Sequence, residues 1–114
     1  MITKEQATKW AEALESGEFK QSMQRLSFYN ESTQKFYHCC LGVLCVTMGW
    51  DKKDETIPTD RYNQLEELFS PEEGDEDNNS IIGRKTYEKY YYYNDMKRFD
   101  FNHIAQLVRK EFVE

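Results

Sequence analysis

Histidine, cysteine and proline are scarce in this sequence, and long apolar runs are missing. The 114 residues include two histidines, three cysteines and two prolines. An odd number of cysteines, two of them adjacent, does not fit the disulfide framework of a small secreted protein. No apolar run approaches the roughly 20 residues of a membrane-spanning helix, and the first residues do not resemble a signal peptide. The sequence therefore predicts a protein of a reducing cytoplasm that does not enter the membrane.

Positive charge is in deficit as well. The chain has 21 acidic and 15 basic residues, and its net charge is −6. This excess disfavours non-specific binding to nucleic acid or to an anionic membrane, because both need a basic surface. A basic protein partner remains compatible with it. Aromatic residues make up 15% of the chain, and disordered chains are poor in aromatic rings. We therefore predict that residues 1–114 form a single compact domain with a polar shell.

The stretch of residues 39–50 contains no charged side chain, although 32% of the chain is charged. A segment that is apolar on every face has to be covered by the rest of the protein. We expect Leu41–Met48 to form a buried helix that ends at Gly49, with a buried strand as the alternative because several of its residues are β-branched. Gly42 costs such a helix about 1 kcal/mol relative to alanine. We interpret this glycine as room for the close approach of another backbone.

The flanking segments show helical and strand patterns. Thr3 and Gln6 form a capping box at the start of a helix that we expect to end at Gly17. Alternating apolar residues predict a hairpin with strands at 24–28 and 35–39, and helical spacing predicts helices at 60–69 and 100–112. Residues 81–95 fit either a helix or an extended segment, and the Asn-Asp pair at 94–95 is a turn signal. The predicted fold class is α+β: a small, mostly helical domain with a β-hairpin packed on a buried apolar central helix.

Five acidic residues lie within the six-residue run 72–77, which turn-forming residues follow. We expect residues 71–80 to form a mobile acidic loop. The alternative is that the run imitates a phosphate backbone and docks on a basic protein. That role needs charges on a rigid surface, and Gly74 inside the run makes this segment a poor scaffold.

His38, Cys39, Cys40 and Cys45 are residue types found in zinc sites and in catalytic cysteine–histidine pairs. Their spacing contains no Cys-x-x-Cys pair, and the chain has one other histidine, His103. Adjacent residues on a strand face opposite ways, which separates His38 from Cys39. Cysteine is also among the most buried residue types. We therefore predict core packing for these residues, with no metal, no cofactor and no catalytic role, and we expect a non-enzymatic protein.

The most unusual local feature is the tyrosine-rich stretch 87–95. Tyrosines at this density form hot spots in protein interfaces or stack on nucleobases. Two basic residues upstream fit a phosphate group, and the Asn-Asp pair fits a ribose or a base edge. The predicted contact residues are Arg84, Lys85, Tyr87, Tyr90, Tyr91, Asn94 and Asp95. The alternative is that these rings close the core and cover its edge.

Short motifs along the chain add a resemblance. They are Trp10, Ala13-Leu14, Ser16-Gly17, Phe19, Gln21, Leu26, the run Cys39 to Cys45, Asn94-Asp95, Phe101 and Ile104-Ala105. With these motifs the sequence resembles a family of small proteins encoded by tailed bacteriophages and prophages, from whose pattern residues 57–93 depart. The resemblance implies a phage origin, the host cytoplasm as location, and an accessory role in binding and inhibiting or redirecting a host protein, in particular a defence-related one. The alternative role is the sequestration of a nucleotide-derived immune signal of the host.

Overall fold

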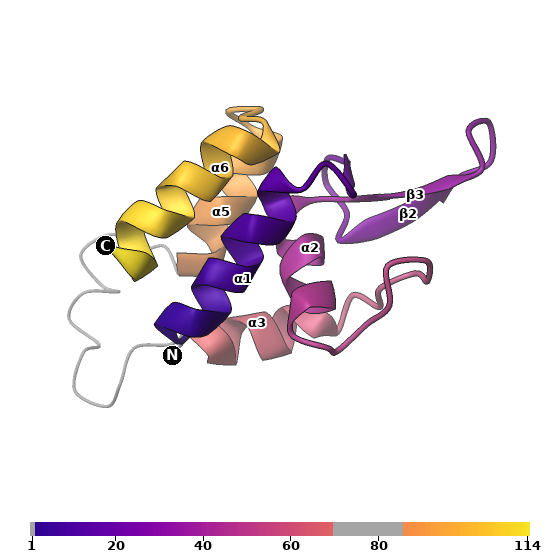
Figure 1. Ribbon diagram of the computed structural model, residues 1–114. Helices are drawn as coiled ribbons and strands as arrows, with labels where there is room; N and C mark the ends of the chain where they lie inside the picture. Colours follow the sequence, from indigo (N-terminus) through magenta and orange to yellow (C-terminus); the bar gives the residue numbers. More distant parts are fainter. Residues whose placement is uncertain (1, 70–85) are drawn as a thin grey trace.

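The computed structural model of the protein describes residues 2–69 and 86–114 (Figure 1). Along the chain the elements are α1 (Lys4–Glu15), β1 (Lys20–Gln21), β2 (Ser27–Asn30), β3 (Lys35–His38), α2 (Cys40–Thr47), α3 (Arg61–Phe69), α5 (Thr86–Asp95), α6 (Phe101–Val108) and the π-helical turn η1 (Arg109–Val113). The strands form one sheet in the order β1-β3-β2. Helices around a small sheet confirm the predicted α+β class. The predicted acidic loop 71–80 lies outside the described residues.

Helix α1 begins and ends as its sequence predicts. The Thr3 hydroxyl accepts a hydrogen bond from the Gln6 amide N–H at 3.0 Å, and the Gln6 side-chain oxygen accepts from the Thr3 N–H at 2.9 Å. Gly17 follows the helix with a φ of 80°, a left-handed conformation that glycine adopts without a steric penalty. The chain therefore turns sharply out of α1 toward the sheet.

The sheet combines the predicted hairpin with one strand that was not predicted. Strands β2 and β3 pair antiparallel and extend away from the helices in Figure 1. The prediction for 24–28 was wrong at its start, because the backbone of Gln24 has a φ of 67° and is not extended. Strand β1 pairs parallel with β3, with Lys20 beside Tyr37 and Gln21 beside His38. Two residues are too few to show the alternation by which a strand is predicted.

The charge-free stretch forms α2, which confirms the predicted buried helix over the strand alternative. Its residues Cys40 to Cys45 are all buried, and Gly49 follows with a φ of 79°. A Cβ atom on Gly42 would overlap the carbonyl oxygen of Leu26. The expected close approach of another backbone is thus confirmed: the chain entering β2 crosses the helix where a side chain is missing.

The other helices cover α2 and close the core. Helix α1 packs along both α2 and α6, and α5 packs against α2 and α3. The Trp10 ring N–H donates to the Cys40 carbonyl oxygen at 2.9 Å, which ties α1 to the start of α2. The largest side chains without solvent exposure are Trp10, Leu41, Leu44, Leu65, Tyr90 and Ile104. Side chains from five helices therefore meet in one core.

For residues 86–95, the structure decides between the helix and the extended segment that the sequence allows for 81–95. Residues 86–95 are helical, and Asn94 and Asp95 end α5, so their interpretation as a turn signal was wrong. Turn-forming asparagines bond to their own local backbone, whereas the Asn94 amide bonds to distant segments. Asp100 caps α6 as predicted, because its carboxylate accepts from the His103 N–H at 2.8 Å.

Candidate functional site

The predicted contact residues do not share one environment. Arg84 and Lys85 lie outside the described residues. Tyr87 is half-buried, with its ring 6.2 Å from that of Tyr62 on α3. Tyr91 is 37% exposed, and Asp95, one helical turn further along α5, is half-buried. Only part of the predicted set therefore meets the solvent.

Tyr90 lies in the core. Its ring is 5.1 Å from that of Trp10 and 6.3 Å from that of Phe69, and its side chain has no exposed surface. The hydroxyl donates to the Glu111 carboxylate at 2.6 Å. Burial, and then this hydrogen bond, raise the pKa of Tyr90 far above its ordinary value. Tyr90 thus follows the alternative in which a ring of the tyrosine stretch closes the core.

Asn94 is fully buried and joins three segments through what we call the Asn94 network. Its side-chain oxygen accepts from the Cys40 N–H at 3.1 Å and from the Gln21 side-chain amide at 2.9 Å. Its side-chain NH₂ donates to the Ser22 carbonyl oxygen at 2.8 Å. Cys39, the residue that precedes α2, makes no side-chain capping bond. Asn94 therefore supplies from α5 the oxygen that the first turn of α2 needs.

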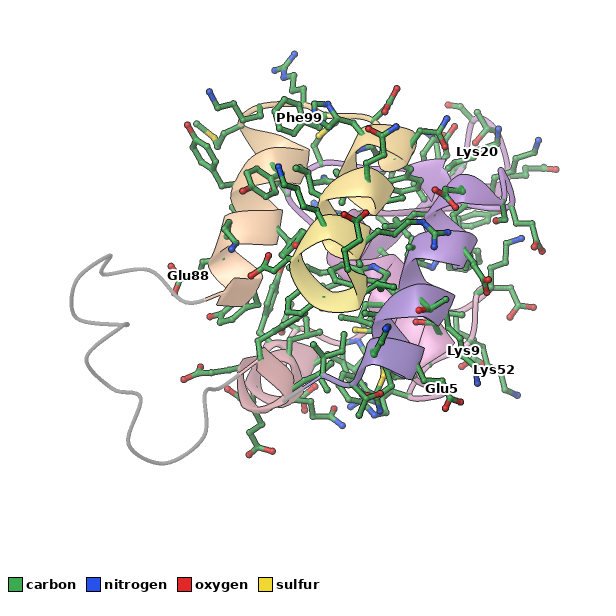
Figure 2. All side chains as sticks on the ribbon, turned by 60° about the vertical axis from the view of Figure 1, so that its left-hand side comes forward. Glu5, Lys9, Lys20, Lys52, Glu88 and Phe99 are labelled. Carbon is green, nitrogen blue, oxygen red and sulfur yellow. The ribbon has the colours of Figure 1, made fainter. Side chains whose placement is uncertain are left out.

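Gln21 extends this network to the loop before α6. The same side-chain NH₂ that reaches Asn94 also donates to the Phe99 carbonyl oxygen at 2.8 Å. Figure 2 places Phe99 at the end of the molecule where α5 gives way to α6. The buried Asn94 amide and the half-buried Gln21 amide thus fix the sheet, the start of α2 and the end of α5 relative to one another.

Large apolar side chains are exposed at the end of α5 and in the loop before β2, and we call the region of Met23, Tyr91, Asp95 and Met96 the α5-end surface. The exposed fractions are 38% for Met23, 37% for Tyr91 and 68% for Met96. The Asn94 NH₂ lies 3.6 Å from the Met23 sulfur and 2.7 Å from the Asp95 carboxylate. Partial burial, and then the Asp95 carboxylate, raise the pKa of Tyr91. Met23 and Asp95 therefore both contact Asn94, and Tyr91 lies near Asp95.

Sequence reasoning missed both methionines of this surface. Met96 stands alone among polar and charged residues in the run Asn-Asp-Met-Lys-Arg. Met96 has no apolar neighbour in this run to pack with, and this pattern indicates an exposed side chain. Nothing local in the sequence indicates that Met23 lies beside Asn94.

The residues considered for metal binding or catalysis lie in an environment that suppresses their reactivity. Burial raises the pKa of the Cys39 thiol to about 12 and raises those of Cys40 and Cys45 as well. Thiolates, not thiols, act as nucleophiles and metal ligands. Burial, and then the charge of Lys53, lower the pKa of His38 to about 4. Within residues 2–69 and 86–114, no group of three or more His, Cys, Asp or Glu side chains is arranged to hold a metal ion.

Comparison with known proteins gives one match. The model of the family described as Domain of unknown function (DUF8296) matches residues 2–76. The chain belongs to this family. No curated protein and no solved structure matches it.

The DUF8296 match covers one side of the Asn94 network and leaves out the other. Gln21 and Cys40 lie within the matched residues, whereas Asn94 and the rest of α5 lie beyond them. In the α5-end surface, only Met23 falls within the match. No helix of the described part of the chain has the length and apolar character needed to cross a membrane.

Proposed function

We propose that this DUF8296 protein is a phage-encoded, non-enzymatic accessory protein that binds a host protein in the host cytoplasm, with the α5-end surface as its contact site. The phage origin and the host setting rest on the sequence resemblance. The binding role rests on the exposure of Met23, Tyr91 and Met96.

The residue types of this surface suit a protein partner. Tyrosine contributes a large ring with few rotatable bonds, and its hydroxyl adds a polar contact. Methionine is flexible and polarizable, so two methionines adapt to the shape of an apolar partner. Asp95, Lys97 and Arg98 add charges beside the apolar side chains. An apolar centre next to charged residues is the usual composition of a protein interface.

The Asn94 network supports the proposal by holding this surface in place. Met23 and Asp95 both contact the buried Asn94 amide. A surface fixed before binding loses less conformational entropy when a partner docks. The observation that carries the proposal is therefore the exposure of apolar side chains around a rigid, buried centre.

The proposal is tested by affinity capture from the lysate of a bacterial host. The immobilised protein is compared with the variant Tyr91→Ser/Met96→Ser, and retained proteins are identified by mass spectrometry. Loss of two central contacts of about 2 kcal/mol or more each would lower the affinity by well over tenfold. We expect a protein that the unchanged chain retains to be absent from the variant.

The matched control is Tyr29→Ser, which removes a tyrosine that is 45% exposed on the hairpin. This control should retain the same partner as the unchanged chain. If the double variant retains that partner as well as the control does, the α5-end surface is not the contact site.

A further inference from the structure

A second recognition surface lies on the hairpin side of the molecule. A groove of about 480 Å³ is lined by Gly17, Glu18, Lys20, Gln34, Lys35, Phe36, Lys53 and Asp54. Three segments contribute to it: the turn after α1, the hairpin, and the loop between α2 and α3. Its volume lies in the range typical of small-molecule sites. We call it the lysine groove.

The topology of the sheet creates this groove. Strand β1 begins at Lys20 and pairs only with Tyr37 and His38 of β3. The earlier residues of β3, Lys35 and Phe36, therefore have no strand beside them on this edge within the described chain. Gly17, with its left-handed backbone, turns the preceding segment away. The space left beside β3 is the floor of the groove.

The same register brings two lysines to one face. Paired residues on neighbouring strands share a face, and side chains alternate along a strand. Lys20 is paired with Tyr37, and Lys35 lies two residues before Tyr37. The residue after Lys20, Gln21, points into the protein, where it bonds to Asn94. Lys20 and Lys35 therefore lie on the outer face of the sheet.

The third lysine is held in place from the opposite wall. The Lys53 ammonium lies 3.8 Å from the Glu18 carboxylate and 5.1 Å from the centre of the Phe19 ring. Glu18, one of the two acidic residues of the lining, is thereby paired. Lys20 and Lys35 have no ion-pair partner among the described residues. Three lysines against Glu18 and Asp54 give the lining a net charge of +1, in a protein of net charge −6.

We propose that the lysine groove binds the phosphate group of a small phosphorylated molecule. Lys20 and Lys35 supply the charges that no carboxylate neutralises, and Lys53 adds a third from the facing loop. The Gln34 amide offers a neutral donor. A small anion suits this site better than a nucleic acid, because the negative charge of the whole protein repels a long polyanion.

This site differs from the phosphate contacts at Arg84 and Lys85 that the sequence predicts, and it is independent of the α5-end surface. The Tyr91→Ser/Met96→Ser variant should therefore bind a phosphate ligand as the unchanged chain does. Failure of the proposed host-protein binding and failure of phosphate binding are consequently separate results.

Isothermal titration calorimetry with pyrophosphate at low ionic strength tests the proposal. We expect the unchanged chain to bind pyrophosphate, and Lys20→Gln/Lys35→Gln to bind it at least tenfold more weakly. The matched control is Lys9→Gln/Lys52→Gln, which removes the same two charges at exposed positions outside the groove. Figure 2 shows Lys9 and Lys52 well apart from Lys20. The control should bind within twofold of the unchanged chain.

Two results would overturn the proposal. One is the absence of pyrophosphate binding by the unchanged chain, and the other is an equal loss in both double variants, which would show a general effect of net charge. ADP in place of pyrophosphate identifies the kind of ligand. Equal affinities indicate recognition of the phosphates alone, and at least tenfold tighter binding of ADP indicates a nucleotide.

Discussion

Asn94 and Met96 are two residues apart in the sequence and have opposite environments. The Asn94 side chain has no exposed surface and bonds to two other segments, the end of β1 and the start of α2, whereas Met96 is 68% exposed. The buried residue stabilises the fold, and its exposed neighbour belongs to the contact surface that we propose. Residues two positions apart thus differ completely in their environment.

The motifs on which the family resemblance rests have a structural role. Gln21, Cys40 and Asn94 come from three separate motifs, and they meet in one hydrogen-bonded network. Trp10, from a fourth motif, donates to the carbonyl oxygen of the same residue, Cys40. Residues that mark the family resemblance therefore build the framework. The side chains that we propose for recognition, such as Met23 and Met96, lie outside these motifs.

The largest loss of stability among the tests of the framework residues is expected for Gly42→Ala. Its new Cβ would overlap the Leu26 carbonyl oxygen, so the helix or the crossing chain must shift. We expect a loss of about 3 kcal/mol in the free energy of unfolding, at the upper end of overpacking effects, measured by urea denaturation.

The matched control is Gly49→Ala, where no atom lies within 4 Å of the added Cβ and the φ of 79° is the only source of strain. This variant should lose about 1 kcal/mol, the usual cost of a left-handed backbone. Equal losses in the two variants would mean that the close approach at Gly42 contributes little.

His38 provides a test through pH, because it is 1% exposed and neither ring nitrogen has a hydrogen-bond partner within the described structure. Burial, and then Lys53, lower its pKa from 6.5 to about 4. The unfolded chain therefore binds the proton first, and the folded state loses stability as the pH falls from 6.5 to about 4. At pH 5 the loss is about 2 kcal/mol.

This loss is measured by urea denaturation at pH 7 and pH 5 in the unchanged chain and in His38→Phe. The variant should lose about 2 kcal/mol less on acidification than the unchanged chain does. His103→Gln, which removes the exposed histidine of α6, should keep the full pH dependence. A His38→Phe variant with the same pH dependence as the unchanged chain would contradict the buried neutral state of His38.

The smallest effect on stability is expected at the α5-end surface. Tyr91→Ser/Met96→Ser changes side chains that are already partly in water, so we expect the free energy of unfolding to fall by no more than about 1 kcal/mol. Thermal denaturation of this variant checks the expectation. A loss as large as that of Gly42→Ala would show that these residues belong to the framework and would remove the contrast with Asn94.

Local signals in the sequence predicted much of the fold. The capping box at Thr3, the left-handed Gly17 and the charge-free stretch around Gly42 each act within a few residues, and each was confirmed. Sequence patterns could not predict two other contacts. These are the pairing of β1 with β3 and the hydrogen bond between Gln21 and Asn94. The latter joins residues 73 positions apart through side-chain amides, which have no periodic pattern.

Local signals also limit what the sequence predicts of the candidate site. Tyrosine density drew attention to α5, but density cannot separate Tyr90 in the core from Tyr91 at the surface. That separation depends on how α5 is rotated against α2 and α3. The lysine groove depends on the register of a two-residue strand, which no pattern in the sequence reveals.

The most direct test of the division between framework and recognition residues is the free energy of unfolding of Asn94→Ala, measured by urea denaturation beside Asn63→Ala. Asn94→Ala leaves the Cys40 N–H and the Ser22 carbonyl oxygen without their partner, and we expect a loss of about 2–4 kcal/mol. Asn63 is exposed on α3, and its replacement should change stability by no more than about 0.5 kcal/mol. Losses of similar size in the two variants would contradict the structural role assigned to the Asn94 network.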